Sequence, residues 1–217
     1  MIVTEQSVRI IRPIDAFYGI ESEVKMCEYA GRNCYASQDK ITDESYQTFI
    51  KNLIARGHET PLEFGDVVFD ITTSRAVLAE LTRHRLASFC VESQRYIQEA
   101  KTGDITFIRP TWHDGIGPEC TEWEHQMQRV EKSYKELIGF GMKPEQAREV
   151  LPNSTACRII MKANFREWRH IFELRCSKRA YPQMRELMTE MLKQAHEAIP
   201  VIFDDLYSEY VSETENE

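Results

Sequence analysis

Arginine and hydroxyl side chains gather in one short stretch of the chain, RHRLASFCVESQRY. It contains Arg83, Arg85 and Arg95 together with His84 and Ser93. Guanidinium groups bind phosphate through paired N–H donors and keep their charge at any accessible pH. The stretch therefore favours a site for a nucleoside monophosphate. Arginines at a solvated helix end are the alternative interpretation of the same pattern.

The elements that must position this stretch follow from hydrophobic spacing and capping residues. Residues 64–71 predict a strand, and Ser74 is a candidate N-cap for the helix after it. We expect this helix to continue through the arginines, so that Glu80, Arg83 and His84 share one face. The charged groups would then project together from the end of a helix.

Extended backbone is expected over residues 89–97. The period of two would place Ser93 and Arg95 on one side of this segment and Glu92 and Gln94 on the other. Two different polar faces are unusual for a purely structural strand. Both faces are therefore candidates for ligand contacts.

The rest of the chain has no internal repeat and no composition break, which predicts a single domain over residues 1–217 with an acidic tail frayed from about residue 211. The expected fold is α+β, with a mainly antiparallel sheet flanked by helices. Residues 100–118 are expected to form a loop because of their glycines and prolines. Further strands are expected near 7–14 and 157–163, and helices over 21–35, 43–56, 119–138, 144–151, 164–175 and 182–199.

Composition narrows the classes of function. The net charge of −8 and the lack of a basic stripe argue against a nucleic-acid partner. No stretch approaches the roughly 20 apolar residues of a membrane span, and no secretory signal is recognisable, so a cytoplasmic protein is expected. The six cysteines never form a CxxC pair, and His113 and His125 have no third ligand at metal spacing. We therefore expect reduced structural thiols and no metal.

Two segments resemble a known family. The run Arg83-His84-Arg85, followed after seven residues by Ser93, resembles the signature of flavin-dependent thymidylate synthases. The upstream run from Gly57 to Glu63, GHETPLE, is similar to the segment that precedes that signature. Motifs in the family's order continue towards the C-terminus, so the resemblance covers roughly residues 30–195.

The resemblance implies roles for individual residues. His58 would lie near the folate and the flavin, and Arg175 would be catalytic because it stabilises a uracil ring deprotonated at N3. The residues implied to bind dUMP are Glu80, Arg83, Glu92, Ser93, Gln94, Arg95, Arg148 and Arg175. Those implied to bind FAD are Thr60, Glu63, Arg83, His84, Arg85, Asn164, Arg166 and His170.

The same resemblance implies the reaction and the partners. The family methylates dUMP to dTMP with methylenetetrahydrofolate as the carbon donor, and FAD reduced by NADPH supplies the hydride. No dinucleotide-binding glycine motif is complete in this sequence, so FAD would be held without a Rossmann domain. A cytoplasmic homotetramer with active sites where subunits meet is the implied assembly.

Two alternatives remain open at the level of sequence. Glu80 stands where many members carry Gln, and Cys90-Val91-Glu92 replaces the commoner Asn-Glu-X, which favours a non-catalytic sensor that binds dUMP and flavin. The other is a classical, thiol-dependent synthase, for which Cys157 after LPNSTA is the candidate nucleophile.

Overall fold

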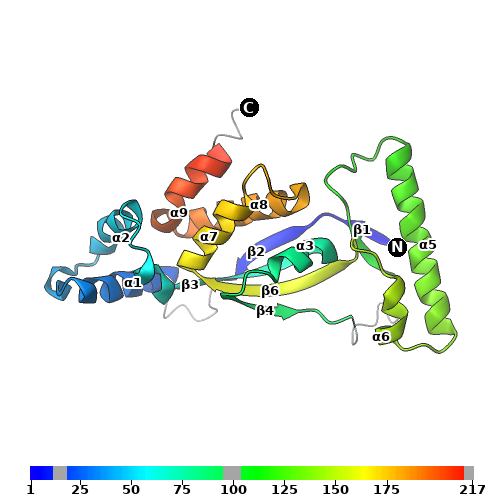
Figure 1. Cartoon of the computed structure of the whole chain (residues 1–217), viewed down its shortest axis with the longest axis horizontal. Coiled ribbons are helices and arrows are strands. Elements are labelled where there is room, and N and C mark those ends of the chain that lie inside the picture. Colours follow the sequence, from blue (N-terminus) through cyan, green and yellow to red (C-terminus); the bar gives the residue numbers. More distant parts are fainter. Residues whose placement is uncertain (12–18, 95–103, 213–217) are drawn as a thin grey trace. The chain divides into compact units, whose positions relative to one another are not determined.

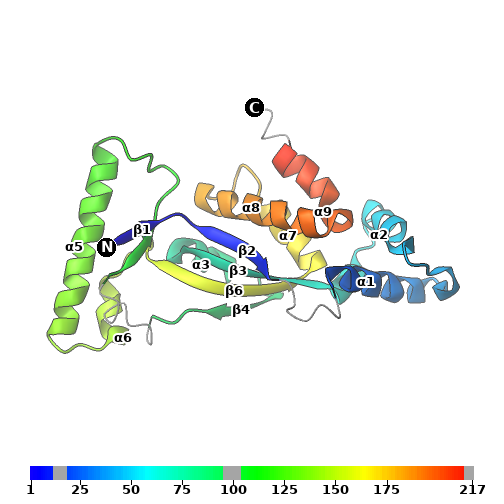
Figure 2. The ribbon, with the colours of Figure 1, turned by 180° about the vertical axis from the view of Figure 1, so that it is seen from behind.

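The computed structural model describes residues 1–11, 19–94 and 104–212. Figure 1 and Figure 2 show the labelled elements from opposite sides. By its internal contacts the chain divides into two compact units, and each is described by itself. The first unit comprises Met1–Ser7, Ile71–Arg83 and Cys90–Ile159, and the second unit comprises Val8–Asp70, His84–Phe89 and Ile160–Glu217.

Two sheets are present in the described residues, and together with the helices they confirm the predicted α+β class. The larger is an antiparallel sheet with the strand order β2-β3-β6-β4 (Figure 2). Its strands are β2 (Ser7–Ile11), β3 (Asp66–Ser74), β4 (Ala87–Val91) and β6 (Ala156–Asn164). The smaller pairs β1 (Ile2–Thr4) with β5 (Thr106–Ile108) in parallel.

The helices follow the predicted periodicity closely in most places. Their bounds are α1 Ile20–Cys34, α2 Ser45–Ala55, α3 Arg75–Leu81, α5 Pro118–Gly139, α6 Pro144–Ala147, α7 Phe165–Arg175, α8 Pro182–Ala198 and α9 Pro200–Tyr207. Short helical turns are η1 Gln38–Lys40, η2 Thr60–Phe64, η3 Arg148–Val150 and the π-helical η4 Ser208–Ser212. The single-domain organisation stays a prediction, and residues 213–217 of the acidic tail lie outside the described residues.

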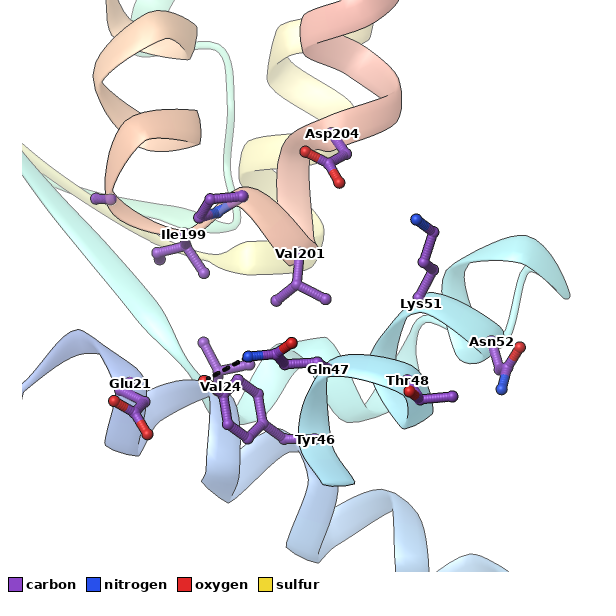
Figure 3. Close-up of a pocket in the computed structure, with 12 residues that line it drawn as sticks. Glu21, Val24, Tyr46, Gln47, Thr48, Lys51, Asn52, Ile199, Val201 and Asp204 are labelled. Carbon is purple, nitrogen blue, oxygen red and sulfur yellow. Dashed lines mark hydrogen bonds between the residues drawn. The ribbon is translucent and has the colours of Figure 1, made fainter. Parts of the chain in front are cut away.

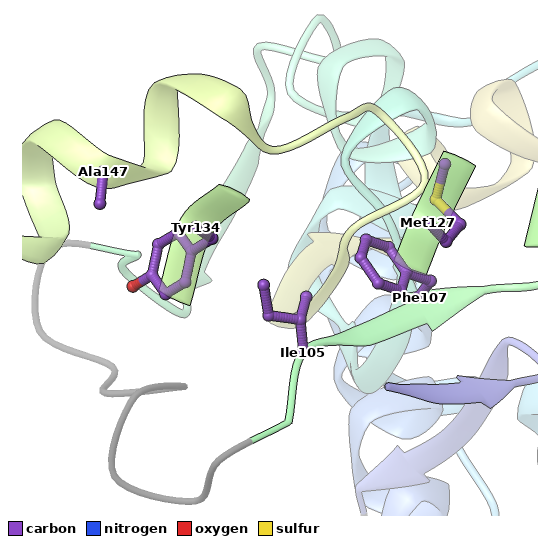
Figure 4. Packing of buried hydrophobic residues seen from close by; sticks show 5 residues of the cluster. All are labelled: Ile105, Phe107, Met127, Tyr134 and Ala147. Carbon is purple, nitrogen blue, oxygen red and sulfur yellow. The ribbon is translucent and has the colours of Figure 1, made fainter. Parts of the chain in front are cut away.

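The core of the first unit forms where α5 covers β5 (Figure 4). Met127 and Tyr134, two turns apart on α5, pack with Ile105 and Phe107 because residues seven apart share a helix face. Glu131 lies on the same face and accepts a hydrogen bond from the backbone N–H of Ile105 at 2.9 Å. A carboxylate in this core is therefore satisfied by the strand that it covers.

The core of the second unit is organised by α7 against β3 and α9. Trp168 is fully buried and meets Phe69 of β3 edge-to-face, with ring centroids 5.0 Å apart. Its indole N–H donates to the carbonyl of Val67 at 3.0 Å, which satisfies the polar end of the ring. Phe172, one turn later, stacks on Trp168 and contacts Phe203 of α9. One face of α7 is thus fixed by packing.

Two glycines flank η2 for different physical reasons. Gly57 has a φ of +68°, which L residues rarely adopt, but a Cβ there would meet nothing within 4 Å. At Gly65 a Cβ would lie 2.3 Å from the Phe165 ring, and the Gly65 carbonyl accepts the Phe165 N–H at 3.0 Å. The first glycine satisfies the backbone angle and the second allows η2 to approach α7.

Two predictions about the elements are wrong, and one helix was not predicted. The helix α3 ends at Leu81, so the signature lies in the turn after it and Glu80, Arg83 and His84 do not share a helix face. The expected loop 100–118 contains the strand β5, whose pairing with β1 joins residues distant in sequence. The last predicted helix, 182–199, is confirmed as α8, which ends at Ala198. The helix α9, which Pro200 starts, was not predicted.

Candidate active site

Helix α7 carries four of the predicted site residues of the second unit. Asn164 is its N-cap, and the Asn164 side-chain oxygen accepts the N–H of Glu167 at 2.8 Å, as the capping pattern indicates. Arg166, His170 and Arg175 follow along the helix. Because α7 is fixed by Trp168 and Phe172, these side chains start from a rigid backbone.

The predicted flavin residues Glu63 and Arg166 form an ion pair between η2 and α7. Arg166 Nη1 lies 2.6 Å from Glu63 Oε1, and both side chains are about half exposed. An exposed pair of this kind contributes only about 0–1 kcal/mol to stability. Thr60, at the start of the same short helix, is also exposed. These groups are paired or solvated at the surface, where a ligand can reach them.

A buried arginine fixes the beginning of η2. Arg169 is 3% exposed and donates to Glu59 Oε1 at 3.1 Å and to the carbonyl of Ile202 at 2.6 Å. Two further bonds, at 2.8 and 2.7 Å, reach the two carboxylate oxygens of Asp205. Burial alone would lower the pKa of Arg169, but the two carboxylates outweigh it and the pKa is raised. The guanidinium therefore stays charged and ties α7 to η2 and α9.

His84, the middle residue of the signature, is buried against the end of α7. Arg175 Nε donates to His84 Nε2 at 3.0 Å, and Glu167 Oε1 lies 3.8 Å from His84 Nδ1. Burial, followed by the charges of Arg175 and His170, lowers the pKa of His84 to about 4. The imidazole is accordingly neutral at physiological pH. Residues 84 and 175 thus meet across 91 positions of sequence.

The remaining predicted residues of the second unit lie at its surface. Arg85 and His170 are exposed, and the Arg85 guanidinium has no ion-pair partner in the described part of the chain. His58 is exposed as well, and its Nδ1 lies 2.9 Å from the hydroxyl of Tyr35 at the end of α1. The structure therefore pairs Glu63 with Arg166 and places His84 beside Arg175 and His170. Thr60 lies on the same short helix as Glu63, and the contact observed for His58 is with Tyr35.

The first unit holds most of the residues predicted for dUMP. Glu80 lies in the last turn of α3, and Arg83 follows in the turn that ends it. The guanidinium groups of Arg83 and Arg148 have no ion-pair partner among the described residues. Arg148 follows α6 directly, as its C-cap. These two cations are available to an anionic ligand.

The segment after β4 supplies three more of the predicted dUMP residues. Glu92 makes two hydrogen bonds with the backbone of Arg158. The Glu92 N–H donates to the Arg158 carbonyl at 2.9 Å, and Glu92 Oε2 accepts the Arg158 N–H at 3.3 Å. Ser93 is half-buried. The Gln94 amide nitrogen is buried and has no hydrogen-bond partner in the residues described, which is unusual for a buried donor. Arg95 lies outside the described residues.

Sequence reasoning missed two residues of this region, Arg169 and Glu167. Both are charged and buried on α7. A signal was available, because Arg169 stands one turn after Phe165 and immediately after Trp168, on the apolar stripe of the helix where charge is rarely buried unless it is paired. A charged residue at a core position predicts an internal partner, which Asp205 and Glu59 supply.

Other features of the structure bear on the alternatives. Burial raises the pKa of the Cys157 thiol to about 11, the opposite of an activated nucleophile, which argues against a thiol-dependent mechanism. All six cysteines are free. Among the described residues, no three His, Cys, Asp or Glu side chains are grouped to hold a metal. None of the described helices is both long enough and apolar enough to span a bilayer.

The second unit also contains a pocket of about 610 Å³ (Figure 3). It lies between α1, α2 and the start of α9, with Lys51, Gln47 and Asp204 around it and Val24 and Val201 as apolar lining. Its lining includes none of the residues predicted to bind dUMP or FAD. The pocket therefore adds nothing to the assignment of the candidate site.

Comparison with known proteins gives consistent results. The family model described as thymidylate synthase complementing protein matches residues 20–201. The flavin-dependent thymidylate synthase of Geobacter sulfurreducens is 34% identical over 183 residues, 81% of this chain and 78% of that protein. Those of Corynebacterium glutamicum and Mycolicibacterium vanbaalenii are 31% and 33% identical over 213 and 199 residues, which are 89% and 83% of this chain and 84% and 78% of those proteins.

Proposed function

The chain belongs to the flavin-dependent thymidylate synthase family, and we propose that it methylates dUMP to dTMP with methylenetetrahydrofolate as carbon donor and NADPH as reductant. The observation that carries the proposal is the contact between two distant motifs: His84 of the signature accepts a hydrogen bond from Arg175 at 3.0 Å. A sensor that only binds its ligands is not favoured, because the relatives above are named as synthases.

Half of the residues proposed to bind dUMP are arginines, and one more, Gln94, has an amide side chain. The guanidinium groups of Arg83 and Arg148, which have no ion-pair partner among the described residues, suit a phosphate, which they can bind with paired N–H donors. The Gln94 amide nitrogen, which has no hydrogen-bond partner in the part of the chain that the structure describes, suits a carbonyl of the base, because a buried donor without a partner is costly unless a ligand satisfies it. The full dUMP set comprises Glu80, Arg83, Glu92, Ser93, Gln94, Arg95, Arg148 and Arg175.

FAD is held by residues on η2, the signature and α7. When bound, it supplies the hydride that completes the methyl group. The donor set fits a flavin dinucleotide, because the exposed Arg85 guanidinium has no ion-pair partner within the described ranges and can face the pyrophosphate. Asn164 uses its oxygen for the helix cap, so its contact with the cofactor comes from Nδ2. The set comprises Thr60, Glu63, Arg83, His84, Arg85, Asn164, Arg166 and His170.

Arg175 is the catalytic residue of this proposal. A guanidinium carries only donors and stays protonated, so Arg175 stabilises a uracil ring that has lost its N3 proton but does not remove that proton. The negative charge raises the electron density at C5, the carbon that attacks the one-carbon unit. Because Nε already donates to His84, the plane of the guanidinium is fixed before the nucleotide binds.

The folate is expected near His58. This histidine is exposed, and its Nδ1 lies 2.9 Å from the Tyr35 hydroxyl, so the imidazole is held at the surface of the second unit. An imidazole in that position can face the planar ring of a folate. The proposal includes a cytoplasmic homotetramer whose subunits complete one another's sites, and the exposed apolar residues Met26 and Tyr29 of α1 suit a covered surface.

Absorbance and tritium release test the proposal on the purified protein. We expect a yellow protein whose flavin is bleached by NADPH faster in the presence of dUMP, and which releases tritium from dUMP labelled at C5. Flavin and dUMP binding without tritium release would instead support the sensor. A colourless protein that cannot be reconstituted with FAD would contradict the assignment of both ligand sets.

A further inference from the structure

His84 stands at a junction between the residues proposed for the two ligands. It belongs to the flavin set, yet its Nε2 lies 3.0 Å from Nε of Arg175, the residue proposed to face the uracil. An arginine can only donate hydrogen bonds. His84 Nε2 must therefore be the acceptor, and the ring proton of the neutral imidazole must be on Nδ1.

The surroundings of the ring agree with this tautomer. His84 is 7% exposed, and the groups that face it come from α7: Arg175, His170 and Glu167. The carboxylate of Glu167 lies 3.8 Å from Nδ1, on the side where the proton is needed. That distance is too long for a hydrogen bond, but a negative charge there favours an N–H at Nδ1 over a bare lone pair.

We propose that His84, as the neutral tautomer protonated at Nδ1, is a positioning residue that orients the Arg175 guanidinium for the pyrimidine. This inference rests on the proposed function of Arg175 and deepens it. The direction in which the planar guanidinium faces depends on rotation about the bonds of the long Arg175 side chain. A hydrogen bond at Nε restricts this rotation. A flavin contact at His84 would then also change the orientation of the group that meets the nucleotide.

The tautomer can be measured directly and independently of catalysis. In protein labelled with ¹⁵N at histidine, two-bond correlations distinguish a protonated ring nitrogen from a bare one. At neutral pH we expect a protonated Nδ1 and a bare Nε2 for His84, assigned by its absence in His84→Gln. His196 is the internal control, because its Nε2 lies 2.8 Å from an Asp204 carboxylate oxygen and must carry the proton. A bare Nδ1 or a doubly protonated ring at His84 would overturn the proposal.

Kinetics separate positioning from flavin binding. His84→Gln keeps an acceptor oxygen, whereas His84→Leu has none. At equal flavin content by absorbance, we expect His84→Leu to lower kcat for tritium release by about 10- to 100-fold and His84→Gln by much less, since a bond to a charged group is lost only in the first. Equal kcat in both variants at equal flavin content contradicts a positioning role. If His84→Leu does not fold, the tautomer and the His84→Gln variant still decide.

The same experiments distinguish failure of the proposed function from failure of the positioning role. A wild-type protein that binds no flavin and releases no tritium, but shows the expected His84 tautomer, would contradict the enzyme assignment and leave the geometry of the pair intact. A protein active in tritium release with the opposite tautomer would keep the function and overturn the positioning role.

Discussion

The residues proposed for FAD in the second unit and those proposed for dUMP in the first unit have very different surroundings. In the second unit Arg166 is paired with Glu63 and His84 with Arg175, all on or against the fixed helix α7. Among the described residues, Arg83 and Arg148 of the first unit have no ion-pair partner and the Gln94 amide nitrogen has no acceptor. Most of the second unit's set is therefore organised in advance, with the exposed Arg85 as the exception, whereas the first unit's set has several groups left for a ligand to satisfy.

The largest expected effect is on the stability of the folded chain, through the buried arginine that fixes η2. Arg169→Met removes the charge that satisfies Asp205 and Glu59, and we expect the free energy of unfolding to fall by about 3–5 kcal/mol. Urea denaturation followed by tryptophan fluorescence measures it. Arg166→Ala on the same helix is the matched control, since an exposed pair contributes only about 0–1 kcal/mol. Equal effects of the two variants would remove the contrast between the buried network and the surface pair.

The next effect is on catalysis. Arg175→Ala should lower kcat for tritium release by about 100- to 1,000-fold, because a fixed donor to a developing anion is lost. Flavin absorbance should remain, since the other members of the flavin set are unchanged. Turnover at the wild-type rate would show that Arg175 does not stabilise the uracil.

The stability of the folded chain should depend on pH through the buried imidazole of His84. Its pKa is lowered to about 4 in the folded chain by burial and by Arg175 and His170, against an ordinary value of 6.5. Because the pKa is lower in the folded chain, the stabilisation is fully present at a pH above the ordinary pKa. It is lost as the pH falls towards the pKa of the folded chain. Between pH 7 and 4.5 the wild type should therefore lose about 2–3 kcal/mol more than His84→Gln.

The measurement for this prediction is urea unfolding of both proteins at a series of pH values. The exposed His125 of α5 provides the control, because His125→Gln should follow the wild type through the same range. Parallel curves for the wild type and His84→Gln would mean that the buried imidazole is not held neutral.

The smallest effect is expected in the first unit. Arg148→Ala should raise the KM for dUMP by about 10- to 30-fold, the worth of one charge-assisted contact, while the free energy of unfolding changes by less than about 0.5 kcal/mol. Steady-state tritium release and urea unfolding test the two halves of this statement. A destabilised Arg148→Ala protein would mean that this arginine is as internally engaged as those of the second unit.

Much of the fold could be predicted from local sequence. The strand β6 alternates between buried residues and residues that are exposed or half-buried, and the cap at Asn164 is formed as its spacing indicates. The exit of the signature from its helix could not be predicted, since nothing in the sequence after Leu81 breaks helical periodicity. Thr106, Phe107 and Ile108 of β5 favour extended backbone, but the pairing of this strand with β1, about one hundred residues away, has no local signal.

The site was predicted through resemblance more than through pattern. Composition and spacing indicated a phosphate site among the arginines, but the roles of Asn164, His170 and Arg175 came from the family alone. Neither source identified Arg169 as the residue that fixes η2, because its partners Asp205 and Glu59 are distant in sequence. Pairings between buried charges are set by tertiary packing, which a single sequence does not display.

The two glycines around η2 imply a pattern of substitutions that a genetic screen can display. If a host depends on this chain for its thymidylate, codon 57 should tolerate asparagine or aspartate, which accept a left-handed backbone and have open space there. Codon 65 should survive as glycine alone, because even one methyl group meets the Phe165 ring. The two positions, eight codons apart, would thus show different selection, one for a backbone angle and one for space beside an aromatic ring.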